Sequence, residues 1–414
     1  MKQDYNFELS KVKSLTSEEK AFRKKNLNLF LETGFPSKRN EDWKFTDLNA
    51  ILNKNFDKIT NNFEFDLNKK IQMLENFEHN YILLTNGLLS ESNFDYEEKN
   101  KIEIKDFKNA EIKNSESPNT LTLLNNALSL GGYSLNVLDN YKFKKPLIIY
   151  NYFSKNLNNV ILNNSNYIKL NKGSELTVIE YTIDNFENNF IKNTSDNILI
   201  DDNAVYQSIY IQKSKSSGHF YRHTQANLEN NSNYHNFILT SGLKFNKSEI
   251  EINLNKEKGN CSILSALNIV ENEHQEIKTR INHYAPNCES YQKIKNVVNE
   301  NGKGVYQGKI FVKDVAQKTN AYQLSKALIL NDNAEFDAKP ELEIYADDVK
   351  CSHGSTSGSI DADAIHYLMT RGIDAKTAKQ LLINGFLNDI MDNISDTNIK
   401  IFLENTLQGQ INGH

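Results

Sequence analysis

Short apolar runs alternate with polar residues along the middle of the chain, from about residue 120 to residue 345. Isoleucine, valine, tyrosine and threonine recur in the alternating order that is typical of half-buried strands, and clusters of Asn, Gly, Ser and Asp separate the runs. Helical periodicity is nearly absent, except at residues 121–130, where the pattern predicts one helix. The clearest strand runs are residues 146–150, 159–162, 176–181, 198–200, 205–211, 248–254, 309–312 and 327–330.

Many short strands at fairly even spacing are typical of a β-sandwich, a β-barrel or a β-solenoid. The β-rich region is long and shows no break between domains. This favours a solenoid modestly, because the rungs of a solenoid contact only their neighbours and can be added without limit. No regular repeat motif is visible, so the pattern alone leaves all three architectures open.

The region before the strands has a mixed pattern. Thr16 and Glu19 fit a capping box at the start of a helix. We expect Trp43, the single tryptophan, to be a structural anchor that packs against a neighbouring element. The pattern therefore predicts an N-terminal mixed domain at residues 1–118 and a β-rich core at residues 119–350.

Helical periodicity returns towards the C-terminus. Asp361 is placed to cap a helix that ends at Gly372, and Asp374 to cap a second helix that ends at Gly385. One or two further helices follow, and their amphipathic pattern means that one face packs on something. We expect these helices, in a domain at residues 351–414, to cover the open end of a solenoid, where apolar core and strand edges are otherwise exposed.

Composition and charge exclude several classes of function. The net charge is −5 and no block of lysine or arginine stands out, which gives nucleic-acid binding little support. The N-terminus has no apolar segment of the secretory type, and no apolar run approaches the ~18 residues of a membrane span. We therefore expect a soluble, cytoplasmic protein. The abundant asparagine and lysine suggest compositional bias of the genome.

The three cysteines, Cys261, Cys288 and Cys351, are far apart in the sequence and form no C-x-x-C motif. Zinc ribbons and ferredoxin-type sites are therefore excluded, and an odd number argues against a disulfide framework. Three thiolates cannot supply four ligands. A cluster bound here would need histidine, a carboxylate or residues from a second chain.

Cys351 and His353 form the most suggestive pair of candidate metal ligands. An alternating run at residues 341–345 predicts a strand, and the glycine- and serine-rich residues 352–358 predict a polar turn after it. In an extended chain residues two apart point the same way, so a thiolate and an imidazole would face one side. The alternative is a buried cysteine beside a histidine that caps the turn.

Two other histidine clusters are weaker candidates. His274, His283 and Cys288 could bind zinc or iron, but their spacing matches no compact motif, and a structural role is expected. His219 and His223 are four residues apart, but strand-like flanks and the absence of an H-E-x-x-H glutamate predict a surface cluster instead of a zinc site.

A glycine-rich stretch at residues 302–310 resembles a phosphate-binding loop only superficially. Gly304 and Gly308 enclose three residues where a P-loop has four, and Ile310 stands in place of the Ser or Thr that holds Mg²⁺. The chain is therefore expected to have no nucleotide site of this kind.

Several segments together resemble one family. Residues 339–355 read KPELEIYADDVKCSHGS, residues 367–373 read YLMTRGI, and residues 34–48 contain G-F-P followed by E-x-W-K-F-T-D-L. The pattern H-x4-C-x-S-x-Q-x2-K, at residues 283–295, belongs to the same set. These motifs resemble SufD proteins of the SufB/SufD family, which assembles iron–sulfur clusters. Gly354 favours the SufD branch, because SufB-type chains tend to carry a glutamate there.

The resemblance implies a mainly β fold, with a right-handed parallel β-helix core between an N-terminal α/β region and a C-terminal helical domain. It implies a non-catalytic scaffold subunit of a SufBCD-type complex that takes part in iron acquisition. His353 matches the histidine that contributes to a transient iron–sulfur cluster, or iron, shared with SufB, and Cys351 matches the cysteine before it.

The resemblance also implies partners. SufB would pair with the terminal β-helix strands, and the SufC ATPase would dock on the C-terminal helices. Whether the chain forms a homodimer when SufB is absent is left open by the sequence. Two readings from other classes remain open: a structural β-solenoid interaction protein without a metal role, and a β-helix polysaccharide-active enzyme.

Overall fold

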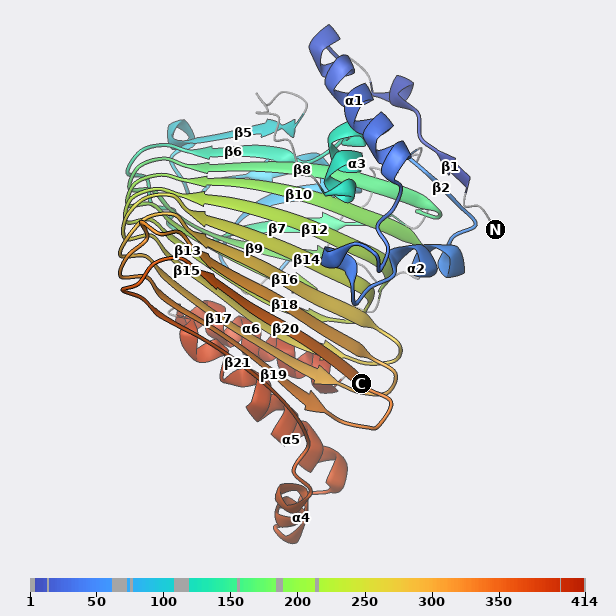
Figure 1. Ribbon diagram of the computed structural model, residues 1–414, viewed down its shortest axis with the longest axis vertical. Coiled ribbons are helices and arrows are strands. Elements are labelled where there is room, and N and C mark those ends of the chain that lie inside the picture. The colour runs from blue at the N-terminus through green and yellow to red at the C-terminus, as the bar shows by residue number, and fades with distance from the viewer. Residues whose placement is uncertain are drawn as a thin grey trace.

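The computed structural model describes residues 4–12, 15–61, 73–74, 77–107, 119–154, 157–183, 189–212, 216–394 and 396–412. Over these described residues the chain folds as a β-solenoid of about seven turns, with 48% of them in strands and with six helices near the two ends of the solenoid (Figure 1). The predicted solenoid core with flanking helices is therefore confirmed. Among the helices of the described residues, none combines the length and apolar content needed to cross a membrane.

The larger of the two sheets has eleven strands. Most of them follow the order β1-β2-β8-β10-β12-β14-β16-β18-β20, and off this path β6 pairs with β8 and β5 pairs with β6. These strands are β1 (Asp4–Asn6), β2 (Lys58–Thr60), β5 (Ile102–Asp106), β6 (Tyr133–Val137), β8 (Val160–Leu170), β10 (Phe190–Ile200), β12 (Ser216–Leu228), β14 (Leu243–Leu254), β16 (His274–His283), β18 (Lys303–Val312) and β20 (Glu335–Ile344).

The smaller sheet has ten strands, in the order β21-β19-β17-β15-β13-β11-β9-β7-β3-β4. Neighbours in both sheets are parallel, except for the antiparallel pairs β3–β4 and β5–β6. The parallel pairs keep one register, apart from a shift between Ser216 and His219 in β12–β14. The strands are β3 (Asn80–Thr85), β4 (Leu88–Asn93), β7 (Leu147–Tyr152), β9 (Glu175–Ile183), β11 (Val205–Gln212), β13 (Asn233–Ser241), β15 (Asn260–Ile269), β17 (Glu289–Val298), β19 (Asn320–Ile329) and β21 (Lys350–Ser359).

In-register pairing stacks the inward side chains of successive rungs into columns. One such column of the larger sheet runs from Ile198 through Ala226, Ile252 and Ile281 to Ile310. All five side chains are buried. Because side chains alternate between the faces of a strand, the other residues point outwards, and this explains the alternating pattern of the sequence.

The corners between the sheets explain part of the asparagine content. At one corner, successive rungs place a residue with positive φ in equivalent turns, and asparagine tolerates this left-handed conformation better than most residues. These corner residues are Asn203, Asn231, Lys258, Asn287 and Lys318, with φ between 52° and 60°. The asparagines at these positions therefore have a structural role beyond compositional bias.

The N-terminal helices α1 (Ser17–Thr33), α2 (Leu48–Asn55) and α3 (Thr120–Leu128) cover the outer face of the larger sheet at its first rungs (Figure 1). Phe30 is fully buried in this interface. The predicted capping box at the start of α1 is confirmed, because Thr16 Oγ1 accepts from Glu19 N and the Glu19 carboxylate accepts from Thr16 N.

The C-terminal helices lie elsewhere than predicted. Apolar residues of α5 (Ala375–Asn388) and α6 (Thr397–Asn412) pack on the outer face of the smaller sheet, not over the open end of the solenoid. That face carries apolar residues, such as Ile209 and Leu239, that would be exposed to water without these helices. The remaining helix, α4 (Ala362–Thr370), has no buried residue.

Two predicted boundaries in this region are wrong. Asp361 and Asp374 cap α4 and α5 as expected, but α5 continues through Gly385 to Asn388, because burial of Leu387 stabilises its last turn. Residues 352–358 are not a turn, because they belong to β21, which pairs with β19 along its whole length. The turn comes earlier, at residues 345–349.

Candidate metal centre at the open end of the solenoid

The last rung of the solenoid holds both predicted ligands. β20 ends the larger sheet and β21 ends the smaller one, so each has a neighbour on one side only among the described strands. Cys351 and His353 are the second and fourth residues of β21 and lie in register with Ala321 and Gln323 of β19. Both candidate ligands therefore lie on the edge strand that faces away from the other rungs.

The side chains of Cys351 and His353 share one face of β21. Cys351 packs against the apolar cluster inside the last rungs, and the Ser355 hydroxyl lies 2.8 Å from that of Ser325, which is fully buried. Because residues 351, 353 and 355 alternate with outward ones, His353 also faces the inner side. It is nevertheless exposed, because β21 is the last strand of its sheet among the strands that the structure describes.

Partial burial affects the chemistry of the Cys351 thiol. Cys351 is partly buried, and this burial raises the pKa of its thiol, although the backbone N–H of Ala321 opposes the shift. The thiol is therefore largely protonated near neutral pH, and an incoming metal would have to displace its proton. Within the residues that the structure describes, no three His, Cys, Asp or Glu side chains form a group that could hold a metal ion.

The other two cysteines are buried deeper in the solenoid. Burial raises the pKa of the Cys261 thiol, with Cys288 adding to the shift, and it raises the pKa of Cys288 to about 11. Cys261 belongs to an inward column that continues through Ser290 and Ala321 to Cys351. Cys261 and Cys351 thus lie on one inward column of the smaller sheet, with two strands between them, although they are far apart in sequence.

The second histidine cluster is not brought together. His274 and His283 stand at opposite ends of β16, where His274 Nε2 lies 2.7 Å from Thr46 Oγ1 and His283 Nε2 lies 2.9 Å from Ser290 Oγ. Burial lowers the pKa of His283 to about 3, so its ring is neutral. Both contacts fit the structural role that was expected.

The predicted surface cluster of His219 and His223 is wrong for His219. This residue is 1% exposed and its ring lies between those of Phe56 and Phe245, because α2 covers that part of the larger sheet. His223 is only partly exposed. Both lie in strand β12, so neither has the helical spacing of a zinc site.

The stretch at residues 302–310 does not form a phosphate loop. Gly304 and Gly308 both lie within strand β18, where their backbones pair with β16 and β20. This observation agrees with the prediction that the stretch is not a P-loop.

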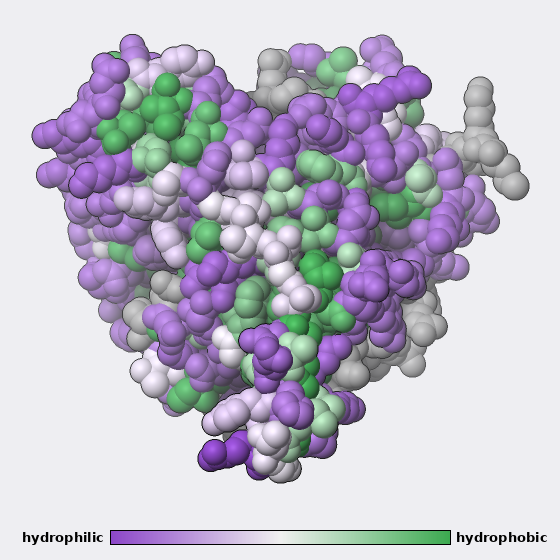
Figure 2. All heavy atoms as spheres, turned by 60° about the horizontal axis from the view of Figure 1, so that its bottom comes forward, coloured by the Kyte–Doolittle hydropathy of each residue, from purple (hydrophilic) through white to green (hydrophobic). Residues whose placement is uncertain are grey.

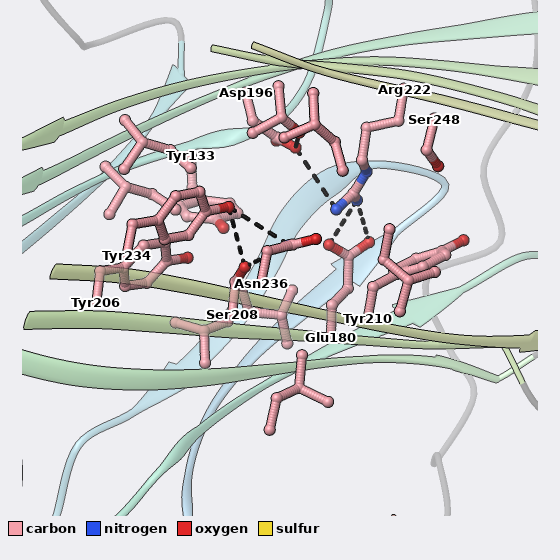
Figure 3. Close-up of a pocket in the computed structure, with 18 residues that line it drawn as sticks. Tyr133, Glu180, Asp196, Tyr206, Ser208, Tyr210, Arg222, Tyr234, Asn236 and Ser248 are labelled. Carbon is pink, nitrogen blue, oxygen red and sulfur yellow. Dashed lines mark hydrogen bonds and ion pairs between the residues drawn. The ribbon is translucent and has the colours of Figure 1, made fainter. Parts of the chain in front are cut away.

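A buried ionic cluster inside the solenoid was missed by the sequence analysis. Arg222 points between two carboxylates, 2.5 Å from Glu180 and 3.5 Å from Asp196, beside a cavity of about 40 Å³ (Figure 3). Lys192 approaches Glu180 to 3.2 Å. Burial alone would raise the pKa of Glu180, but Arg222 and Lys192 lower it to about 2. Glu180 interrupts an apolar run, which was the only sequence signal of this cluster.

Two family models together match most of this chain. The family described as SUF system FeS cluster assembly, SufBD core domain, matches residues 152–386, and the SufBD protein N-terminal region matches residues 5–149. The chain is 28% identical over 382 residues to the iron–sulfur cluster assembly protein SufD of Escherichia coli, covering 91% of this chain and 89% of the relative.

Two further relatives match shorter parts. Identity is 27% over 248 residues to the chloroplastic protein ABCI7 of Arabidopsis thaliana, covering 59% of this chain and 52% of the relative. The chain is 31% identical over 133 residues to SufD of Bacillus subtilis, and this match covers 32% of this chain and 30% of the relative. The resemblance seen in the sequence is thereby confirmed. The match to the core domain alone spans more than half of this chain. The chain therefore belongs to the SufB/SufD family of iron–sulfur cluster assembly proteins.

Proposed function

We propose that this chain is a SufD-like, non-catalytic scaffold subunit of a cytoplasmic complex with SufB and SufC partners. In this proposal Cys351 and His353 lie on the path of the nascent iron–sulfur cluster. Family membership and the similarity to Escherichia coli SufD support the general role. The observation that carries the specific role is the position of both residues, on one face of the outermost strand.

The open edge of β21 supports pairing with a second solenoid. Lys350 N donates to the carbonyl of Thr319, the residue just before β19. Because residues alternate in a parallel ladder, the peptide groups of Cys351 and His353 face the open edge. A long edge of unpaired N–H and C=O groups is a template for another strand. A SufB strand added there would lie directly beside both candidate ligands.

The ligand chemistry suits a cluster that must be handed on. Cysteine thiolates bind iron–sulfur clusters, and histidine can replace them. In this proposal Cys351 and His353 supply part of a ligand set that SufB residues complete, so that movement of the two subunits opens the site. The cluster is cargo and not a resident cofactor of this chain.

The C-terminal helices offer a surface for the ATPase partner. Figure 2 turns the lower end of Figure 1 forward and shows apolar and near-neutral residues through the middle of this face, with hydrophilic residues around them. On α4, Tyr367 is 60% exposed and Met369 is 46% exposed. We infer that SufC docks on α4 and α5, which leaves ATP hydrolysis to the partner.

One ion-pair clamp could transmit movement of these helices. Asp389, at the end of α5, lies 3.0 Å from Lys293 and 2.6 Å from Lys295 of β17. Only β19 separates β17 from β21 in the sheet. Displacement of α5 would therefore act on the sheet close to Cys351 and His353, if the interface has two stable arrangements.

The test is co-expression of the chain with its SufB and SufC partners, followed by anaerobic purification. The wild type is compared with the variants His353→Ala and Cys351→Ala. The control variant is Ser352→Ala, because the Ser352 side chain points to the opposite face of β21. Iron, sulfide and visible absorbance are measured per complex, with subunit stoichiometry as the control for assembly.

Loss of iron and absorbance from an intact complex is expected for His353→Ala, with Ser352→Ala matching the wild type. Equal iron in His353→Ala and the wild type would refute the ligand role and favour a structural solenoid without a metal role. Enzymatic breakdown of polysaccharide by the chain alone would favour the other alternative.

A further inference from the structure

A polar cluster lies inside the last rungs, directly behind the candidate metal centre. Tyr306, Gln292, Gln323 and Thr279 point into the solenoid and are each at most 2% exposed. Tyr306 Oη lies 3.2 Å from Gln292 Oε1 and 3.1 Å from Gln323 Oε1, and Thr279 Oγ1 lies 2.5 Å from Gln292 Oε1. The interior of a solenoid is usually apolar, so this cluster needs an explanation.

The orientation of the Gln323 amide is fixed independently of the other groups. Its nitrogen donates to the backbone carbonyl of Glu341 at 3.2 Å, and a carbonyl can only accept. Gln323 Oε1 must therefore face Tyr306, whose hydroxyl donates to it. If the oxygen and nitrogen of the Gln292 amide are exchanged, this amide donates hydrogen bonds to the hydroxyl oxygens of Tyr306 and Thr279. The hydroxyl hydrogen of Tyr306 is then available for Gln323 Oε1.

Gly308 shows that the fold makes room for this arrangement. A Cβ atom at Gly308 would lie 2.2 Å from Tyr306 Oη and 2.5 Å from Gln323 Oε1, distances that real Cβ atoms do not reach. Any side chain at this position would displace the contact between Tyr306 and Gln323. Glycine in this strand is thus explained by the close approach of a polar group and not by a turn.

Gln323 is also the residue of β19 that lies in register with His353. Neighbouring strands are about 4.8 Å apart and both side chains face the inner side, so the side chains of Gln323 and His353 are neighbours in this column. Gln292, one rung deeper, is in register with Gln323 and is separated from His353 by it. His353 is therefore the terminal member of an inward polar column.

We propose that Gln323 is a positioning residue for His353, an inference that rests on the proposed ligand role of His353. A metal-bound imidazole keeps a proton on its second ring nitrogen, and a hydrogen-bond acceptor for that proton fixes the tautomer and ring direction. Gln323 Oε1 has a second lone pair free for this purpose. Held by Tyr306 and Glu341, it directs the other nitrogen of His353 to the open edge.

The closing experiment compares Gln323→Met with Gln292→Met. Methionine keeps the length of the side chain and removes its polar atoms. Both glutamines contact Tyr306, but only Gln323 is in register with His353. Two quantities are measured: iron affinity of the complex with SufB and SufC, by chelator competition, and ring ¹⁵N shifts of His353 in the full chain alone, assigned with His353→Ala.

We expect Gln323→Met to lower iron affinity about 10- to 100-fold, the usual effect of losing such a partner. We also expect its His353 ring to move from one tautomer to the mixture of free histidine. Gln292→Met should change neither quantity. Gln323→Glu keeps an acceptor oxygen and should retain the single tautomer, which decides the question if Gln323→Met does not fold.

The outcomes separate the two proposals. If His353→Ala retains iron, the ligand role fails. If His353→Ala loses iron while Gln323→Met behaves as the wild type, only the positioning role fails. Equal losses in Gln292→Met and Gln323→Met, or unchanged ¹⁵N shifts in Gln323→Met, would show that the cluster is purely structural.

Discussion

The ammonium group of Lys247 lies 4.3 Å from the centroid of the Trp43 ring. The Trp43 side chain, from the N-terminal segment, therefore covers a buried charge of the middle rungs. Lys247 also pairs with Glu276, and both side chains are fully buried. Thr46 Oγ1 donates to Glu276 at 2.5 Å. The motif around Trp43 is therefore an anchor, as predicted from the sequence, and it holds the N-terminal segment on the outer face of the larger sheet.

Removing Lys247 should destabilise the whole fold. Burial alone would raise the pKa of Glu276, but Lys247, His274 and Thr46 hold it well below its usual range, so the carboxylate is charged. In Lys247→Met that charge loses its counter-ion, which we expect to lower the free energy of unfolding by about 3–5 kcal/mol. Denaturant titration measures this loss.

The matched control is Lys142→Met, which breaks an exposed ion pair with Glu175. Such pairs contribute about 0–1 kcal/mol, so unfolding of this variant should be nearly that of the wild type. Similar losses in both variants would contradict the idea that burial of the Lys247 pair makes it important.

His219 should make the chain sensitive to mild acid. Burial, together with nearby Lys244, lowers the pKa of His219 to about 3. Between pH 6.5 and 3 the unfolded chain takes up a proton that the folded chain excludes, so stability falls as pH falls. His219→Phe should reduce this slope by up to about 1.4 kcal/mol per pH unit between pH 6 and 4.

Unfolding titrations at pH 4, 5, 6 and 7 measure the slope. His283, whose pKa burial also lowers to about 3, leaves a residual slope of the same sign. His366→Phe is the control, because His366 is exposed on α4. A slope in His219→Phe as steep as that of the wild type would show that His219 takes up its proton in the folded chain.

The three cysteines should differ in reactivity. Cys261 and Cys288 are at most 1% exposed and their pKa values are raised by burial, whereas Cys351 is partly exposed on the edge strand. A thiol reagent should therefore modify one thiol in the native chain and three after denaturation, and raising the pH should speed the native reaction. Rapid labelling that persists in Cys351→Ala would contradict this order.

The alternating pattern was sufficient to predict strands, but it could not identify the solenoid. Sandwiches, barrels and solenoids all bury every second residue, and the family resemblance decided among them. The same limit hid the interior polar groups. Gln323 alternates with Tyr322 and Leu324 as an outward polar residue would, because the face that points inward can be assigned only when the corners are known. Glu180 gave only the weaker signal of one charge within an apolar run.

The misplaced turn before the C-terminal helices has a related cause. Residues 352–358 contain only serine, threonine, glycine and His353, which without neighbours are typical of a turn. In the structure they extend the smaller sheet by one strand, at the end where no further rung of this chain demands apolar side chains. Pairing with β19 overrides the local preference. Cys351 and His353 were still expected to face one side, because alternation does not depend on where the strand ends.

The proposed pairing of β21 with SufB leads to the last prediction. The N–H of Thr356 points to β19, and that of Ser357 points to the open edge, because alternate residues of a parallel strand bond opposite neighbours. Proline removes the N–H group and is tolerated at edge positions. Ser357→Pro should therefore leave the isolated chain folded, yet sharply reduce the amount of SufB that co-purifies with it.

Thr356→Pro is the matched control, because it removes a hydrogen bond within the sheet and should release β21 itself. Hydrogen exchange of the isolated variants separates the two effects: β21 should stay protected in Ser357→Pro and lose protection in Thr356→Pro. Co-purification of SufB with Ser357→Pro at the level of the wild type would mean that the partner does not add a strand to this edge. Cys351 and His353 would then need another route to the ligands that complete their site.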